Sequence, residues 1–153
     1  MGYRADMGRN RTILLVDDNP DDVELAMRAF ERNKLAGEVV VAKDGEEALD
    51  YLFASGVHRH RDPEAHPLLV LLDLKLPKIT GLDVLKQMRA DRRTRRTPVV
   101  VLSSSNEEQD INDSYDLGAN SFVRKPVDFA HFIDAARQLG LYWLTLNEPS
   151  THR

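Results

Sequence analysis

The sequence predicts a doubly wound α/β fold, in which a five-stranded parallel sheet carries helices on both faces. Three observations support this prediction. Short apolar runs rich in β-branched residues recur along the chain, helix-start signals separate them, and each run is continuous rather than alternating between apolar and polar residues. Continuous runs are typical of strands buried on both faces of a parallel sheet. Right-handed connections between such strands favour the order 2-1-3-4-5.

The predicted strands are separated by helices with recognisable starts. The strands span residues 12–16, 39–42, 68–72, 99–102 and 121–123, of which the last is the weakest. The first four helices begin after residues that suit the N-cap position, namely Asn19, Asp44, Thr80 and Asn106. Acidic or amide side chains in the following turn strengthen each start. The helix after Asn106 has the thinnest apolar stripe, mainly Ile111 and Tyr115, so we expect this helix to move most easily.

Length and composition indicate one domain with an ordinary core. The chain has 153 residues, of which 42% are hydrophobic, and a net charge of -4 that disfavours nucleic acid as a partner. It has no cysteine, and no apolar run approaches the roughly 18–20 residues of a membrane span. We therefore expect a cytoplasmic protein that binds neither membrane nor nucleic acid. We expect residues 1–10 to be disordered, residues 11–139 to form the domain and residues 140–153 to extend it.

Polar side chains follow the predicted strands at the edge where an open parallel sheet binds ligands. Asp17 and Asp18 follow the first strand, Asp73 the third, Ser103 the fourth and Lys125 the fifth. Each residue alone would fit a helix cap or a turn, but together they place three carboxylates, a hydroxyl and an ammonium group on one rim. Three carboxylates repel one another unless protons or a cation offset their charge. Oxygen ligands without cysteine indicate a hard cation, and Mg²⁺ fits best.

A divalent cation beside carboxylates and a lysine is suited to phosphoryl transfer. The cation and the ammonium group of Lys125 neutralise charge on the phosphoryl oxygens while a carboxylate attacks. Asp73 stands alone at its strand end, as a nucleophile requires, whereas Asp17 and Asp18 are paired like metal ligands. Ser103 can donate a hydrogen bond to a phosphoryl oxygen. The sequence therefore predicts that Asp73 accepts a phosphoryl group.

These residues resemble the signature of bacterial two-component receiver domains. The match consists of Asp17-Asp18, the segment DLKLPKITG that begins at Asp73, Ser103, and Lys125-Pro126, and it spans roughly residues 11–139. The resemblance implies a flavodoxin-like receiver fold. It also implies that Asp73 takes its phosphoryl group from a phosphohistidine of a sensor histidine kinase. Such a domain is a switch that acts only on its own phosphorylation and dephosphorylation, so we expect no enzyme activity on other substrates.

The resemblance also assigns roles to individual residues. It implies that Asp18, Asp73 and the backbone carbonyl of Lys75 bind Mg²⁺ directly, and Asp17 mainly through water. It implies that Lys125 pairs with the phosphoryl oxygens. A second set, Ser103 and Phe122, would form the switch, and the Lys125–Pro126 bond would be cis. The chain departs from the pattern at Lys75, where many receivers have a neutral residue, and at Ser103, which replaces the more usual threonine.

The residues after Leu139 form an apolar segment beyond the last predicted helix. They include Trp143 and several apolar residues, and they are too few for a DNA-binding module. The segment either extends the last helix and packs back on the domain, or forms an arm that makes a homodimer. This ending and the long loop before Pro67 resemble the stand-alone response regulators of bacterial and cyanobacterial phytochromes. That resemblance implies a phytochrome as the kinase, and a downstream partner that the sequence does not identify.

Two other functions remain open from the sequence. One is a phosphorylation-independent interaction module with the same fold. The other is a phosphatase resembling the haloacid dehalogenases, which also use an aspartate nucleophile with Mg²⁺. That family places the nucleophile on its first strand with a second carboxylate two residues later, whereas Asp73 follows the third predicted strand and Lys75 stands at the second position.

Two clusters outside the rim have simpler interpretations. The basic run 89–96 has no interleaved aromatic residues for base stacking, so a solvated loop is favoured over a nucleic-acid site, and contact with the kinase is an alternative. The loop before Pro67 contains His58, His60 and His66, which indicate a solvated loop or a metal site.

Overall fold

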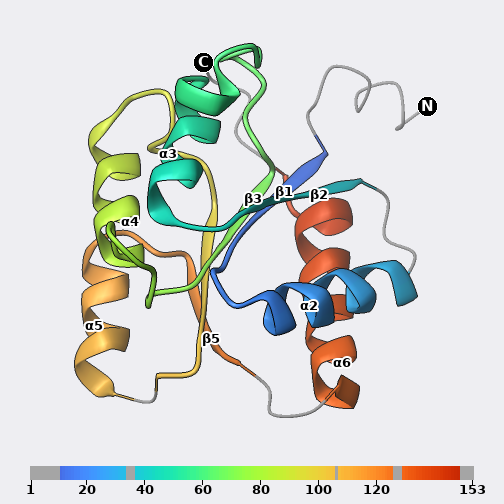
Figure 1. Cartoon of the computed structure of the whole chain (residues 1–153). Coiled ribbons are helices and arrows are strands. Elements are labelled where there is room, and N and C mark those ends of the chain that lie inside the picture. The colour runs from blue at the N-terminus through green and yellow to red at the C-terminus, as the bar shows by residue number, and fades with distance from the viewer. Residues whose placement is uncertain (1–10, 34–36, 106, 126–128, 149–153) are drawn as a thin grey trace.

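The computed structural model, which describes residues 11–33, 37–105, 107–125 and 129–148, contains the predicted five-stranded parallel sheet. Its strands lie in the order β2-β1-β3-β4-β5 (Figure 1). Their bounds are Thr12–Val16 for β1, Glu38–Ala42 for β2, Leu69–Leu72 for β3, Val99–Ser103 for β4 and Ser121–Arg124 for β5. The predicted order is confirmed, and each strand end lies within one residue of its predicted position.

Helices cover both faces of the sheet (Figure 1). One face carries α3 (Gly45–Phe53), α4 (Gly81–Ala90) and α5 (Glu108–Asp116), and the other carries α2 (Pro20–Arg32) and α6 (Phe129–Gly140). A short 3-10 turn, η1 (Gly56–His58), follows α3, and a wider π-helical segment, η2 (Leu141–Leu146), continues α6. Within the described ranges, no helix is long and apolar enough to cross a membrane.

Successive residues of the central strands point into two separate cores, because side chains alternate across a sheet. On the α3–α5 face, strand residues such as Leu14, Val70 and Val101 pack with Leu85 and Met88. The second core, between the sheet and α2 and α6, joins alternate strand residues to helix residues; its buried members include Ile13, Leu15, Leu69, Leu71, Val100, Ala26, Ala29 and Ala136. Continuous burial of β1, β3 and β4 explains their unbroken apolar sequences.

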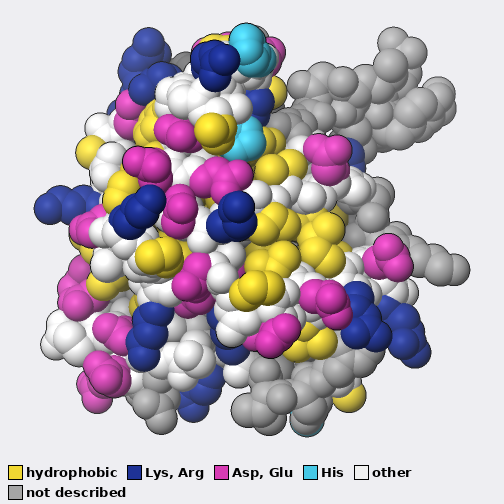
Figure 2. All heavy atoms as spheres, viewed as in Figure 1, with side chains coloured by type: hydrophobic (Ala, Val, Ile, Leu, Met, Phe, Trp, Pro, Cys, Tyr) yellow, Lys and Arg dark blue, Asp and Glu magenta, His cyan; other side chains and the backbone are white. Residues whose placement is uncertain are grey.

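The edge strand β2 is less buried, and its three valines are only partly covered. Figure 2 shows acidic and basic side chains interspersed over the face in view, with apolar side chains gathered in the region of β2 and α2. Met27 of α2 is one of the large exposed apolar residues. The prediction of a sheet buried on both faces therefore holds for the central strands, and only in part for the edge strands β2 and β5.

Three of the four predicted helix caps are confirmed. The side chains of Asn19, Asp44 and Thr80 accept hydrogen bonds from backbone amides in the first turns of α2, α3 and α4. The fourth prediction is wrong in position, because α5 begins at Glu108 with Glu107 as its N-cap; Asn106 itself lies outside the described residues.

The buried side of α5 also differs from the prediction. Tyr115 is 49% exposed and does not anchor the helix. The buried residue is Ser114, whose hydroxyl donates to the backbone carbonyl of Asp110 at 2.7 Å. A serine that satisfies its hydroxyl on its own helix can be buried without a partner elsewhere, so the apolar spacing of the sequence did not reveal it.

The segment after α6 extends that helix and packs back on the domain. Leu144 is only 7% exposed and belongs to the second core, with Trp143 packed against it. Arg11 Nη2 donates to the Leu144 carbonyl at 2.8 Å, which ties the segment to the start of β1. Three apolar side chains of the same segment remain exposed, namely Leu141, Tyr142 and Leu146. The homodimer arm therefore stays a prediction, as does the domain boundary at Leu139.

The basic run contains one residue that is not part of a solvated loop. Arg89 lies in the last turn of α4 and is half-buried. Its guanidinium donates to the carbonyls of Gly118, Thr94 and Thr97 and to Asn120 Oδ1. The prediction of a solvated loop is thus wrong for Arg89, whereas the other arginines of the run are exposed, namely Arg92, Arg93, Arg95 and Arg96.

Other predictions concern the His-rich loop and the undescribed segments. His58 lies beside α3, with its Nε2 3.4 Å from Glu47 Oε2 and its ring against Tyr51. Among the described residues, the group of acidic or histidine side chains suited to a metal lies elsewhere, so the loop metal site gains no support. Two further predictions, a disordered segment 1–10 and a cis Lys125–Pro126 bond, involve residues outside the described ranges.

Candidate functional site

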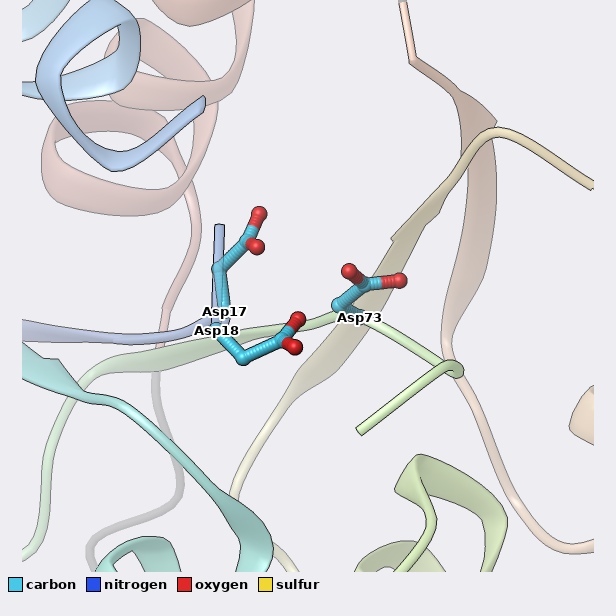
Figure 3. A group of neighbouring side chains, drawn as sticks. All are labelled: Asp17, Asp18 and Asp73. Atoms are coloured by element: carbon cyan, nitrogen blue, oxygen red, sulfur yellow. The ribbon is translucent and has the colours of Figure 1, made fainter. Parts of the chain in front are cut away.

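The predicted rim exists at the carboxyl ends of β1 and β3. These strands are neighbours with Val16 opposite Leu72, so the residues that follow them, Asp17 and Asp73, come together. Carboxylate oxygens of Asp17, Asp18 and Asp73 all lie within 4.8 Å of one another. Figure 3 shows the three side chains facing the same space beyond the strand ends.

Lys125 reaches this rim from the end of β5. Its Nζ donates to Asp17 Oδ2 at 2.9 Å and to Asp73 Oδ2 at 3.1 Å. A third carboxylate, Asp22 Oδ2 in the first turn of α2, accepts from the same nitrogen at 2.8 Å. Asp22 was not predicted as a site residue, because an acidic residue in a first helical turn is already explained by the helix dipole. The available signal was its place on a helix that begins directly beyond the end of β1.

Two of the three clustered aspartates are buried, and the third is exposed. Asp17 and Asp73 are 3% and 8% exposed, whereas Asp18 is an exposed residue. Burial raises the pKa of Asp73 above its usual value, and the charge of Asp17 raises it further, against the lowering effect of Lys125. A ligand can therefore approach from the side of Asp18, while the rest of the site is screened from water.

The ammonium group of Lys125 remains charged despite its burial. Burial by itself lowers the pKa of Lys125, but hydrogen bonds to Asp22 and Asp17 and the charge of Asp73 outweigh that effect. The net pKa is raised above the ordinary value of lysine. A fixed positive charge is thus held beside Asp73 at any physiological pH.

The loop after β3 fixes the position of Asp73. The backbone N–H of Asp73 donates to the Val16 carbonyl at 3.0 Å, and Lys75 N donates to Asp73 Oδ1 at 3.3 Å. A Cβ on Gly81 would lie 2.2 Å from the Asp73 carbonyl oxygen, so only glycine allows the loop to close this tightly. The Lys75 side chain is exposed. The loop therefore holds the Asp73 carboxylate at the rim.

The two predicted switch residues lie on the neighbouring strands. Ser103 at the end of β4 is fully buried, and its hydroxyl oxygen accepts from Ser105 N at 3.1 Å. The Ser105 hydroxyl in turn donates to Asp110 Oδ2 at 2.6 Å, which connects this loop to α5. Phe122 on β5 is partly buried and packs against the core under α4 and α5. Ser103 therefore stands at the strand end on the rim side and Phe122 lies two pairs further back along the β4–β5 ladder, and the switching role of both residues stays a prediction.

The donor set fits a divalent cation. Three carboxylate oxygens from two strand ends converge, one of them from an exposed residue that a hydrated ion can reach. Hard cations such as Mg²⁺ and Mn²⁺ prefer oxygen ligands of this kind. One ammonium group, that of Lys125, faces the carboxylates of Asp17, Asp22 and Asp73, with Asp18 beside them, so carboxylates outnumber the ammonium group at this rim.

Comparison with protein families matches residues 13–137 to the response regulator receiver domain. Among curated relatives, the probable methanogenesis regulatory protein FilR2 of Methanothrix harundinacea is 40% identical over 136 residues, which cover 88% of this chain and 84% of FilR2. Response regulator Rcp1 of Synechocystis is 31% identical over 134 residues, which cover 88% of this chain and 89% of Rcp1.

Solved structures give the same match. The phosphorylated cyanobacterial phytochrome response regulator RcpA superposes with a TM-score of 0.85 at 35% identity, covering 93% of this chain and 99% of RcpA. The bacteriophytochrome response regulator AtBRR is 54% identical with a TM-score of 0.73, covering 92% and 99% of the two chains. The Mn²⁺-bound form of Rcp1 has a TM-score of 0.83 at 29% identity, covering 92% and 99%. A divalent cation at the aspartate cluster agrees with this last neighbour.

Proposed function

The chain belongs to the family of response regulator receiver domains, and we propose that Asp73 accepts a phosphoryl group from a phosphohistidine of a sensor histidine kinase. Receiver domains are switches rather than enzymes that turn over a separate substrate. The observation that carries the proposal is the contact of Lys125 Nζ with the Asp73 carboxylate at 3.1 Å, inside a cluster of three converging carboxylates.

The transfer needs one nucleophile and charge stabilisation. An oxygen of the Asp73 carboxylate attacks the phosphorus atom, the new O–P bond forms, and the P–N bond to the histidine breaks with its electron pair returning to the imidazole, which takes up a proton. Lys125 stabilises the negative charge on the phosphoryl oxygens, and Ser103 donates a hydrogen bond to one of them. Mg²⁺ bound by Asp18, Asp73 and the Lys75 carbonyl, with Asp17 mainly through water, would supply the remaining positive charge.

The new phosphoryl group changes which contacts are favourable. It adds about −1.5 to −2 charges and three acceptor oxygens at Asp73. When the Ser103 hydroxyl turns to the phosphoryl group, it leaves Ser105 N, and Phe122 rotates inward behind it. The loop that joins β4 to α5 then repacks, which gives a partner protein a different surface to bind.

The relatives suggest which kinase acts on this chain, and the exposed segment after α6 suggests that the chain forms a homodimer. RcpA and AtBRR are phytochrome response regulators, so we propose a phytochrome as the kinase of this chain, in the cytoplasm. The exposed apolar side chains of η2, namely Leu141, Tyr142 and Leu146, support a homodimer formed through this segment. Nucleic acid is not expected as a partner, and the downstream protein would read the state of Asp73.

Incubation with Mg²⁺ and acetyl phosphate, followed by intact mass measurement, tests the proposal. We expect one added phosphoryl group on the wild-type chain and none on Asp73→Asn or after chelation of the metal. No mass gain on the wild-type chain would favour a phosphorylation-independent interaction module. Sustained release of phosphate from phosphate monoesters would instead favour a phosphatase.

A further inference from the structure

We propose that Asp22 is the positioning residue of Lys125, holding its ammonium group beside the acceptor through the whole phosphorylation cycle. This inference rests on the proposed acceptance of a phosphoryl group by Asp73. It adds a role for a residue of α2 that lies outside both the carboxylate cluster and the switch pair.

Lys125 uses all of its hydrogen-bonding capacity on carboxylates. An ammonium group has three N–H donors, and Nζ lies within 3.1 Å of three different carboxylates. The contact with Asp22, at 2.8 Å, is the shortest of the three. Because the Lys125 side chain is only 11% exposed, water cannot easily replace a lost partner.

The three carboxylates differ in what the reaction does to them. Asp73 becomes an acyl phosphate and loses its own negative charge when the O–P bond forms. Asp17 belongs to the oxygen cluster suited to a divalent cation, so its charge is shared with that cation. Asp22 is not a member of that cluster, so neither the new O–P bond nor a cation bound by the cluster changes its charge, and it can keep its contact with Lys125.

The backbone of Asp22 is itself fixed in place. Its N–H donates to the side chain of Asn19, the N-cap of α2, at 3.3 Å, and Val23 N donates to the Asn19 carbonyl at 3.0 Å. Asp22 therefore projects from a capped helix start, and its carboxylate can hold the Lys125 ammonium within reach of the incoming phosphoryl oxygens. Burial lowers the pKa of Lys125, and the hydrogen bond that Lys125 donates to Asp22 is the leading opposing effect.

The test measures the rate of phosphorylation by acetyl phosphate at saturating Mg²⁺ in full-length Asp22→Ala, Asp22→Asn and Asp21→Ala. Asp21 is the matched control, because it has the same charge in the same helical turn but makes no described contact with Lys125. We expect Asp22→Ala to lower the maximal rate constant about tenfold with a smaller change in the half-saturating donor concentration. Asp22→Asn, which keeps an acceptor oxygen, should recover part of the loss, and Asp21→Ala should stay within about twofold of wild type.

Three outcomes would overturn the inference. One is an Asp22→Ala rate equal to or above that of wild type, and another is an equal loss in Asp21→Ala, which would indicate a general charge effect. The third is a loss confined to the half-saturating donor concentration. All three leave the wild-type reaction intact and are thus distinct from failure of the proposed function, in which the wild-type chain itself takes up no phosphoryl group.

Discussion

The substitution Leu144→Ala tests whether the segment after α6 belongs to the folded domain. Leu144 is 7% exposed and packs in the core shared by the sheet, α2 and α6. Truncation of a buried leucine to alanine costs about 2–5 kcal/mol, depending on how far the surroundings collapse into the cavity. Because Leu144 lies at the border of this core, in a segment whose other leucines are exposed, we expect its surroundings to relax in part and the loss to be about 2–3 kcal/mol. Leu146 lies in the same segment but is 65% exposed, so Leu146→Ala should lower the free energy of unfolding by less than about 0.5 kcal/mol.

Urea unfolding followed by circular dichroism measures both variants against wild type. With a slope of about 2 kcal/mol per molar urea, the midpoint of Leu144→Ala should fall by about 1–1.5 M, and its Tm by about 5–10 °C. Both substitutions make the same change in helix propensity, so the difference between them isolates the lost packing. Equal midpoints for the two variants would refute the assignment of Leu144 to the core.

Three further predictions test other contacts. Arg89→Ala should cost about 2 kcal/mol in urea unfolding, because it removes several hydrogen bonds from a half-buried guanidinium, while the exposed Arg92→Ala should change stability by less than about 0.5 kcal/mol. Hydrogen bonds from Arg93 lower the pKa of Asp91 to about 2, so their contribution to stability is present above the unfolded pKa of about 3.9 and disappears as the pH falls through about 2. Arg93→Ala should therefore lose about 0.2–1 kcal/mol at pH 7 and lose progressively less in acid unfolding curves between about pH 4 and pH 2, and a pH-independent loss would contradict this assignment. Tyr142→Asp should weaken self-association, measured as the molar mass by light scattering, without lowering the Tm, since Tyr142 is 48% exposed. Equal molar masses for the wild-type chain and the variant would contradict a dimer formed through this segment.

The fold could be predicted because its signals are local. The unbroken apolar runs of β1, β3 and β4 indicate burial on both faces of the sheet. The cap residues Asn19, Asp44 and Thr80 each mark the start of a helix. Strand order follows from general rules of connection handedness rather than from any contact in this chain. The rim of Asp17, Asp18, Asp73 and Lys125 could be predicted for the same reason, since parallel strands bring their carboxyl ends to one edge.

Other features depend on contacts between residues distant in sequence. Asp22 contacts Lys125 across a separation of 103 positions, and only the folded sheet brings the end of β5 to the rim where α2 begins. In the sequence, Arg89 is indistinguishable from the other arginines of its basic run. Its hydrogen bonds to Gly118 and Asn120 exist only because the fold brings α4 next to the loop before β5. The thin anchoring of α5 agrees with the prediction, but apolar spacing did not identify its buried residue, Ser114, because Ser114 is polar and donates its hydroxyl to its own helix. Hydrophobic spacing cannot identify such contacts.

Site mapping of the phosphoryl group most directly tests the claim that the rim of carboxylates prepares Asp73 to carry phosphate. Borohydride reduces an acyl phosphate to an alcohol, so an aspartyl phosphate is converted to homoserine and can be located by peptide mass spectrometry. After treatment with Mg²⁺ and acetyl phosphate, we expect homoserine at position 73 alone, and none when the metal is chelated. Homoserine at Asp17, Asp18 or Asp22, or equal labelling of position 73 without a divalent cation, would contradict the account.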